Sequence, residues 1–203
     1  AIADRLTTDV VNFLAMPAHK NIHIDIEERM TPDIVRGVQQ GHASLGIYWD
    51  AMTKGELQSR PYCRDRLCVV VPARHSLAVN KKIKFEHTLS YPHAGLPVNS
   101  ATQTLMQRQA AQLGQTFVQR IVVSTFETAI RVVRTSAAIC IAPREIAQPL
   151  ASSYEIKLLE LDEPWALRQF VICYRSPLEL TPSARLLADY LGAIMNLCEK
   201  EAS

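Results

Sequence analysis

The sequence predicts an α/β fold with two Rossmann-like subdomains joined by two crossover strands. Strand-like and helix-like segments alternate along the chain, which is typical of α/β proteins with a mostly parallel sheet. The alternation occurs in two clusters, and no Gly/Ser linker separates them. The joins fall at strand-like segments near residues 67–73 and 164–172, so the last helix returns to the first subdomain. We therefore expect residues 1–72 and 167–203 to form subdomain I and 73–166 to form subdomain II, with a hinged cleft between them.

The first cluster begins with an amphipathic helix over residues 2–16, which Pro17 ends. Residues 22–26 alternate isoleucine with polar residues and predict a strand. A second helix begins at Thr31, whose hydroxyl we expect to cap it. After that helix, residues 45–49 form a short apolar strand. Strand, helix and strand at this spacing predict a right-handed βαβ unit with parallel strands.

The middle stretch predicts two strands, at residues 57–62 and 67–71, ended by Pro72. Basic residues bracket these strands, and we interpret them as a solvated face, because acidic residues such as Asp65 dilute the charge.

The second cluster resumes the alternation of strands and helices. The predicted strands cover residues 94–97, 118–123, 138–142, 156–161 and 166–174. The predicted helices run from Asn99-Ser100 to about residue 113, over residues 125–134, from Pro143 onward, and from Thr181 to about residue 198.

Composition excludes several classes of protein. Of the 203 residues, 48% are hydrophobic and 21% charged, and the formal net charge of +2 gives no support for direct contact with nucleic acid. Apolar runs such as residues 67–71 are far shorter than the ~18 residues of a membrane span. Neither GxGxxG nor GxxxxGK[ST] occurs, so we expect no nucleotide cofactor.

Five cysteines without a CxxC pair favour a reducing compartment over a disulfide scaffold. Cys68, Cys140 and Cys173 lie in β-branched runs, where a thiol is a small buried hydrophobe. No signal-peptide pattern opens the sequence, and we expect a cytoplasmic protein without a membrane partner.

The chain offers no positive case for an enzyme. No HExxH motif and no GxSxG elbow occurs, and the acidic pairs are adjacent residues that diverge on a strand. We therefore expect no catalytic residue and no metal site.

The predicted helix starts are the candidate binding groups. Hydroxyls or amides lie at Met30-Thr31, at Asn99-Ser100-Ala101-Thr102 and at Ser124-Thr125. Free N–H groups and the helix dipole make such starts suitable for a carboxylate or a similar anion, although simple N-capping explains each one singly. Tyr48 and Trp49 lie at the end of the predicted strand over residues 45–49, where they would form either an aromatic wall of the site or part of the core or of an interface.

Three blocks of the sequence resemble the effector-binding domain of LysR-type transcriptional regulators. These are the acidic strand at residues 24–28 with the helix start at 31–38 and the strand at 41–47; the segments at 60–62, 65–67 and 69–78; and residues 139–143. Ser44 stands where the family commonly has Asp, and Ser76 where it commonly has Pro. The resemblance covers nearly the whole chain.

The resemblance implies a periplasmic-binding-protein-like (type 2) fold with a small-molecule inducer in the cleft between the subdomains. By motif, the family's ligand positions fall on Thr31, on Asn99, Ser100, Ala101 and Thr102, and on Ser124 to Phe126. A regulator of this family also carries an N-terminal winged helix-turn-helix, which this sequence does not show, and we expect DNA contact only through it. We expect a homodimer or tetramer, with the helix at 2–16 as the candidate contact.

These observations favour a ligand-sensing domain of a transcriptional regulator. The alternative is a solute-binding protein of a transport system, which would share the fold and the cleft. A third class, an enzyme on the same fold, would gain support from a cleft histidine or cysteine with a strongly perturbed pKa.

Overall fold

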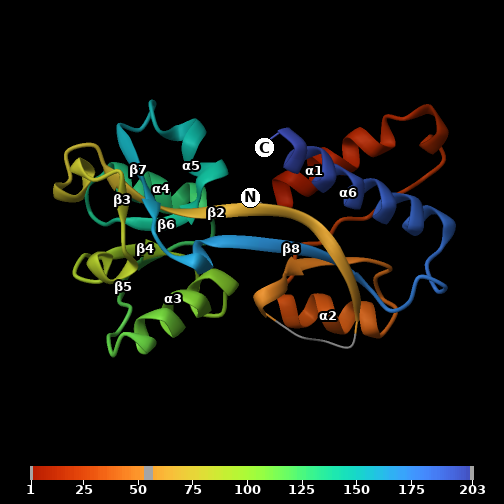
Figure 1. The fold of residues 1–203 in the computed structure, drawn as a ribbon, viewed down its shortest axis with the longest axis horizontal. Helices are drawn as coiled ribbons and strands as arrows, with labels where there is room; N and C mark the ends of the chain where they lie inside the picture. The colour runs from red at the N-terminus through yellow and green to blue at the C-terminus, as the bar shows by residue number, and fades with distance from the viewer. Residues whose placement is uncertain (1, 53–56, 202–203) are drawn as a thin grey trace. The chain divides into compact units, whose positions relative to one another are not determined.

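The computed structural model describes residues 2–52 and 57–201 (Figure 1). Its contacts divide the chain into two units. Unit 1 comprises Ala1–Arg64 and Gln169–Ser203, and unit 2 comprises Asp65–Arg168. The sequence placed these divisions after residues 72 and 166 instead. The difference arises because β2 (Gln58–Pro72) and β8 (Leu167–Tyr174) each begin in one unit and end in the other.

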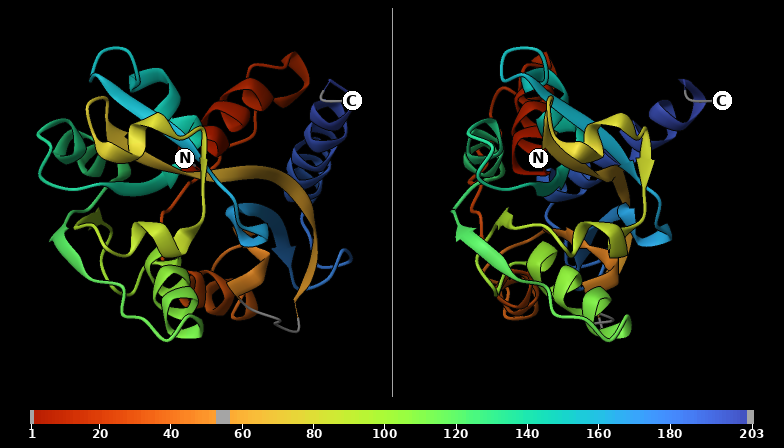
Figure 2. Two further views of the ribbon diagram at one scale, coloured as in Figure 1. Left: turned by 60° about the vertical axis from the view of Figure 1, so that its left-hand side comes forward. Right: turned by 90° about the vertical axis from the view of Figure 1, so that its left-hand side faces the viewer.

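Unit 1 contains two long helices that pack together. These are α1 (Ile2–Leu14) and α6 (Pro182–Glu201), and they lie side by side in the views of Figures 1 and 2. Phe13 of α1 is fully buried, and the centroid of its ring lies 5.4 Å from the centroid of the Tyr190 ring on α6. Tyr62 of β2 is also fully buried and donates a 2.6 Å hydrogen bond to Asp9 of α1. The predicted helix at the start of the chain is thus confirmed.

The other half of unit 1 packs α2 (Thr31–Gln39) against β1 (Gly46–Trp49), which pairs antiparallel with β8. Gly41 closes α2 with a φ of +76°, a conformation that glycine adopts without strain. Gly46 permits the close approach of helix and strand, since a Cβ there would lie 2.6 Å from Ile34 Cγ2.

Two predictions for this region are wrong. Residues 22–26 form no strand, because no strand within residues 2–52 and 57–201 pairs with their backbone, and so the parallel βαβ pair is not observed. Thr31 is the first residue of α2 rather than its cap, since Met30 holds the extended cap position and makes no side-chain cap bond. Pro32 therefore occupies the second helical position, where its missing N–H removes no bond within the helix.

Unit 2 is built on the buried part of β2. This strand pairs antiparallel with β6 (Cys140–Pro143) and β7 (Ile156–Leu161), and β7 pairs parallel with β3 (Lys82–Ile83). A second, two-stranded sheet joins β4 (His93–Gly95) and β5 (Gln119–Val122) in parallel. The sheets are therefore mixed, and the expected mostly parallel sheet is wrong. The two strands predicted at 57–62 and 67–71 form one continuous strand, β2.

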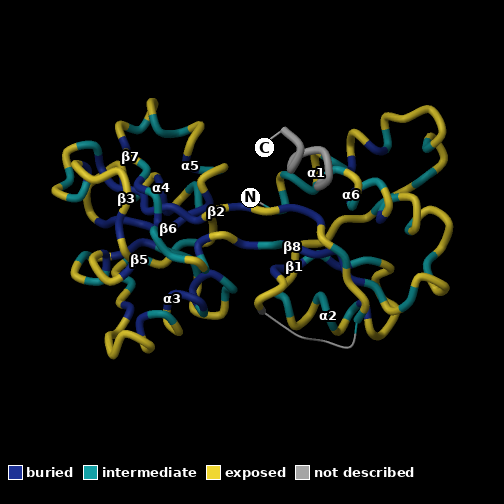
Figure 3. Tube along the Cα trace, in the orientation of Figure 1, coloured by how far each residue is buried: buried dark blue, intermediate teal, exposed yellow. Residues whose placement is uncertain are grey.

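The helices of unit 2 are α3 (Ala101–Gln112), α4 (Phe126–Arg134) and α5 (Arg144–Leu150), with short 3₁₀ turns between other elements. The core of unit 2 lies among α4, α5 and the strands, and it follows the dark segments of β2 and β6 in Figure 3. The buried cysteines Cys68 and Cys140 belong to it, as the sequence predicted. No helix in the described ranges combines the length and apolar character that crossing a bilayer requires.

Candidate functional site

The start of α3 is the first group of predicted binding residues. Ser100 occupies the cap position with extended backbone, and its hydroxyl accepts a 3.3 Å hydrogen bond from the N–H of Gln103. Asn99 before it is exposed, and Ser100 and Ala101 are half-buried. Within the described chain the N–H groups of Ala101 and Thr102 have no protein acceptor. The helix start therefore presents two donors in addition to its dipole.

A buried ion pair contacts this helix start through the side chain of Thr102. The guanidinium of Arg168 donates two hydrogen bonds to the carboxylate of Asp65, the Nε–Oδ1 contact being 2.6 Å long. Its Nη1 donates a third bond, 3.2 Å long, to the hydroxyl oxygen of Thr102. All three side chains are at most 7% exposed. Because the oxygen of Thr102 accepts from Arg168, its hydroxyl proton is free to donate elsewhere.

The start of α4 is the second group of predicted residues in unit 2. Thr125 caps this helix, with its hydroxyl oxygen 3.2 Å from the N–H of Thr128. Ser124 directly before it is exposed, and its side chain has no protein partner within the described residues. Phe126 is half-buried and packs against the core of unit 2. Thus Ser124 offers a hydroxyl to solvent, whereas Phe126 is held by apolar contacts.

The remaining predicted residues belong to unit 1. Thr31 is half-buried at the first position of α2. Tyr48 and Trp49 are only 6% and 5% exposed, and Tyr48 packs with Val38 and Val171 in the core of that unit. Burial raises the pKa of the Tyr48 hydroxyl. Of the two explanations offered for these aromatic residues, the structure favours core packing.

Sequence reasoning missed Asp65 and Arg168, because the basic residues around Asp65 indicate a solvated face and Arg168 lies in no motif. The signal that could have identified them is the alternation within single strands. Asp65 lies at the same parity as buried Cys63 and Leu67, and Arg168 at the same parity as buried Phe170. A charged residue at an inward position of a strand predicts a buried partner.

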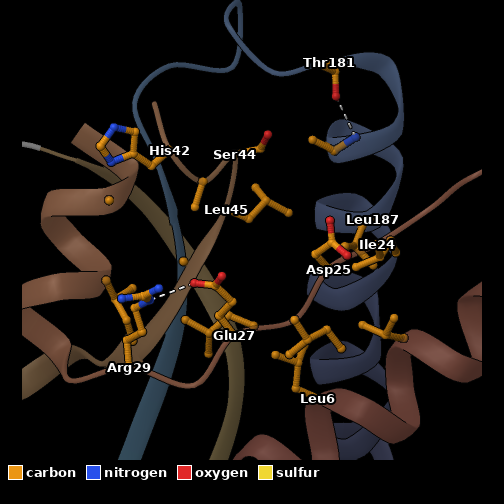
Figure 4. A pocket seen from close by; sticks show the side chains of 18 of the residues that line it. Leu6, Ile24, Asp25, Glu27, Arg29, His42, Ser44, Leu45, Thr181 and Leu187 are labelled. Atoms are coloured by element: carbon orange, nitrogen blue, oxygen red, sulfur yellow. Dashed lines mark hydrogen bonds and ion pairs between the residues drawn. The ribbon is translucent and has the colours of Figure 1, made fainter. Parts of the chain in front are cut away.

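A pocket of about 730 Å³ lies wholly within unit 1 (Figure 4). Residues of α1, α2, α6 and the extended segment 22–27 line it, together with residues 42–47. None of the predicted binding residues is among its lining residues, so this pocket and the helix starts of unit 2 are separate features. In the described ranges, no group of three His, Cys, Asp or Glu side chains is arranged to hold a metal ion.

The fold of this chain is shared with solved regulatory domains. The effector binding domain of QuiR in complex with shikimate aligns with a TM-score of 0.78 and 20% identity, over 95% of this chain and 90% of that one. The CcmR regulatory domain of Synechocystis PCC6803, in complex with 2-PG, aligns with a TM-score of 0.80 and 16% identity, over 95% and 92% of the two chains. At these identities the likeness establishes the fold.

A longer relative extends beyond the aligned region. HinK, a LysR family transcriptional regulator from Pseudomonas aeruginosa, aligns with a TM-score of 0.76 and 17% identity over 93% of this chain, which spans 65% of the HinK chain. No curated protein matches the sequence.

The expected architecture is confirmed by the match to a family and by these structures. The sequence model of the LysR substrate binding domain matches residues 15–195, which is most of the chain. The chain therefore belongs to the LysR substrate binding domain family.

Proposed function

We propose that this chain is the effector-binding domain of a LysR-type transcriptional regulator and that it binds a small anionic metabolite at the helix starts of unit 2. The observation that carries the proposal is the start of α3. There the N–H groups of Ala101 and Thr102 lack protein acceptors, and the hydroxyl of Thr102 is left with a proton to donate. A carboxylate would accept from these groups and interact favourably with the helix dipole.

The start of α4 offers one further hydroxyl, and the buried ion pair determines what kind of recognition the helix starts can provide. The exposed hydroxyl of Ser124 precedes α4, whose start is capped internally by Thr125. The charge of Arg168 is balanced by Asp65, so that pair shapes the site without adding a strong positive field. Specificity would therefore come from hydrogen-bond geometry more than from net charge. Contact of the effector with Thr31 of unit 1 stays a prediction. Its location between the two subdomains also stays a prediction.

The family match favours a regulator over the solute-binding protein of a transport system. The relatives QuiR and CcmR were solved with small molecules bound, shikimate and 2-PG respectively, which agrees with an effector-binding role. In the proposed regulator, DNA is contacted by a separate N-terminal domain, and the protein acts in the cytoplasm as a homodimer or tetramer without catalysing a reaction. Effector binding would shift the population of its conformations and so alter transcription.

A thermal-shift screen against small carboxylates tests the proposal. A ligand present at 100 times its Kd adds about 2.7 kcal/mol to the free energy of unfolding, which is easily measured. We expect a hit whose stabilisation is reduced by Ser124→Ala, a substitution that removes no contact within the described protein. Stabilisation that is unchanged by this substitution and by Thr102→Val would contradict the assigned site.

A further inference from the structure

The hydroxyl oxygen of Thr102 accepts a hydrogen bond from a permanently charged donor. Arg168 Nη1 donates this 3.2 Å bond, while Nε and Nη2 of the same guanidinium donate to the carboxylate of Asp65. The three residues are at most 7% exposed, and all of them belong to unit 2. A guanidinium carries donors only and keeps its charge at every ordinary pH, so the direction of the bond to Thr102 is fixed.

Asp65 determines how the guanidinium is oriented. Its two carboxylate oxygens accept from two nitrogens of Arg168, and this fork-to-fork contact holds the plane of the guanidinium in one orientation. Nη1 is the nitrogen that lies outside the fork, and it is the one that contacts Thr102. The ion pair therefore acts on the helix start through the hydroxyl of Thr102, without any need to touch a ligand.

The bond from Arg168 decides how the Thr102 hydroxyl interacts with other groups. An oxygen that already accepts from a cation is a poor acceptor for a second donor and a stronger donor of its own proton. This hydroxyl donates to no protein group within the described residues. The N–H groups of Ala101 and Thr102 are donors as well. The start of α3 thus offers three donors on two adjacent residues, and a group bound there has to accept from them.

We propose that Arg168 and Asp65 are positioning residues that make the start of α3 selective for an ionised carboxylate over the neutral carboxamide of the same shape. This inference rests on the proposed function, in which the effector meets this helix start. A carboxylate has two oxygens that only accept, so it satisfies the N–H groups and the Thr102 hydroxyl together. A carboxamide places an NH₂ group where one of these donors points, which leaves donors on both sides unpaired. Sites built on hydrogen bonds reject such ligands strongly.

A role in selectivity differs from a role in stability alone. If the ion pair only stabilises the fold, its replacement changes the stability of unit 2 and alters the affinity for every ligand by the same factor. If the pair positions the hydroxyl, its replacement changes the ratio of two affinities. The reason is that without Arg168 the Thr102 hydroxyl can rotate and accept from an amide.

NMR titrations of the isotope-labelled chain with acetate and with acetamide measure this ratio. The readout is the chemical shift of the Ala101 and Thr102 amides, with sodium chloride at the same ionic strength as the reference. In the unsubstituted chain we expect acetate to bind at least about tenfold more tightly than acetamide. A double variant, Asp65→Leu with Arg168→Met, should reduce this preference to less than about threefold. Apolar replacement of a whole buried ion pair is often neutral for stability, so the variant is expected to fold.

Single substitutions on α3 separate the effect of the hydroxyl from that of the helix. Thr102→Val should lower the preference for acetate as the double variant does, and Thr102→Ser, which keeps the hydroxyl, should retain the preference. Thr104→Val is the matched control, because the hydroxyl of Thr104 already donates a 3.0 Å bond to the carbonyl of Ser100. If the double variant fails to fold, Arg168→Lys takes its place and should also lower the preference, since an ammonium keeps the charge but lacks the fork.

Two results would overturn the inference while leaving a binding site at α3. The first is equal binding of acetate and acetamide by the unsubstituted chain. The second is a preference for acetate that persists undiminished in the double variant or in Arg168→Lys. A different result marks failure of the proposed function: if acetate shifts neither the Ala101 nor the Thr102 amide beyond the chloride reference, no carboxylate binds at the start of α3, and the inference falls with the site.

Discussion

Arg168 and Asp65 form a buried ion pair at the two positions where the chain passes between the units. Arg168 is the last residue of unit 2 on β8, and Asp65 is its first residue on β2. Through Thr102 the same guanidinium reaches the start of α3. The pair thus links both crossover strands to the helix start at which we propose that the effector binds.

Removing one partner of this pair should be severely destabilising. Asp65→Ala leaves a buried guanidinium without its carboxylate, and we expect a loss of about 3–5 kcal/mol in the free energy of unfolding. Glu179→Ala, which breaks the exposed pair with Arg175, is the control and should cost less than about 1 kcal/mol. Urea unfolding measures both. Equal losses for the two variants would show that Asp65 is solvated in solution.

Substitution by alanine should change the stability of the protein in opposite directions at Gly46 and at Gly37. A Cβ at Gly46 would lie 2.6 Å from Ile34 Cγ2 and 2.9 Å from Cys173 Sγ, so Gly46→Ala should destabilise by about 1–3 kcal/mol. Gly37 lies within α2 and has open space where a Cβ would be added, so Gly37→Ala should stabilise by about 0.5–1 kcal/mol. Thermal unfolding of the two variants gives the signs directly, and stabilisation by Gly46→Ala would refute the close packing of α2 on β1.

His93 should make stability fall in mildly acidic solution. Its ring is 1% exposed beside Phe117, its Nδ1 lies 2.9 Å from the carbonyl of Tyr91, and burial lowers its pKa from 6.5 to about 4. The unfolded chain therefore binds more protons than the folded chain below pH 6.5. The contribution of neutral His93 to the free energy of unfolding is complete above pH 6.5 and is lost as the pH falls toward 4. It amounts to on the order of 3 kcal/mol.

The matching measurement is the free energy of unfolding as a function of pH. His93→Phe keeps an aromatic ring against Phe117 and should flatten the curve between pH 6.5 and 4, although it loses the bond to Tyr91. His87→Gln, at an exposed histidine, is the control for the loss of a histidine side chain. An unchanged slope in His93→Phe would mean that His93 titrates normally in the folded protein.

The buried cysteines should be unreactive in the folded protein. Burial raises the pKa of Cys68 to about 12 and that of Cys173 to about 11, and it raises the pKa of Cys140 as well. At pH 8 the thiolate fraction of Cys68 is on the order of 10⁻⁴. In a Cys198→Ser background we expect modification by an aromatic disulfide reagent to follow the rate of unfolding. A fast phase in native buffer would place one of these thiols in solvent.

The sequence predicted the elements well where local chemistry decides them. Ser100 and Thr125 begin α3 and α4 through side-chain caps, and both helices lie close to their expected bounds. The sequence-based prediction of strands failed where the structure of a segment depends on pairing with residues far away in the sequence. Residues 22–26 have a strand pattern but no neighbour, and strand direction in unit 2 depends on pairings that periodicity does not encode.

The candidate site shows the same division. The helix starts that carry hydroxyls could be read from capping chemistry, because a cap and its helix are adjacent in sequence. Asp65 and Arg168 could not be paired from the sequence, since they are separated by 103 positions. The burial of Tyr48 and Trp49 also depends on residues of β8, which lie far along the chain.

The most direct test of effector binding at unit 2 compares two helix caps. Thr125 caps α4 at the proposed site, and Thr181 caps α6 in unit 1, each accepting a 3.2 Å bond from a backbone N–H. Thr125→Ala and Thr181→Ala should each cost about 1 kcal/mol in stability. With the carboxylate found by thermal shift as the titrant, calorimetry should show Kd raised about tenfold by Thr125→Ala and by Ser124→Ala, and unchanged by Thr181→Ala. Equal affinities in all three variants would contradict a binding site at the start of α4.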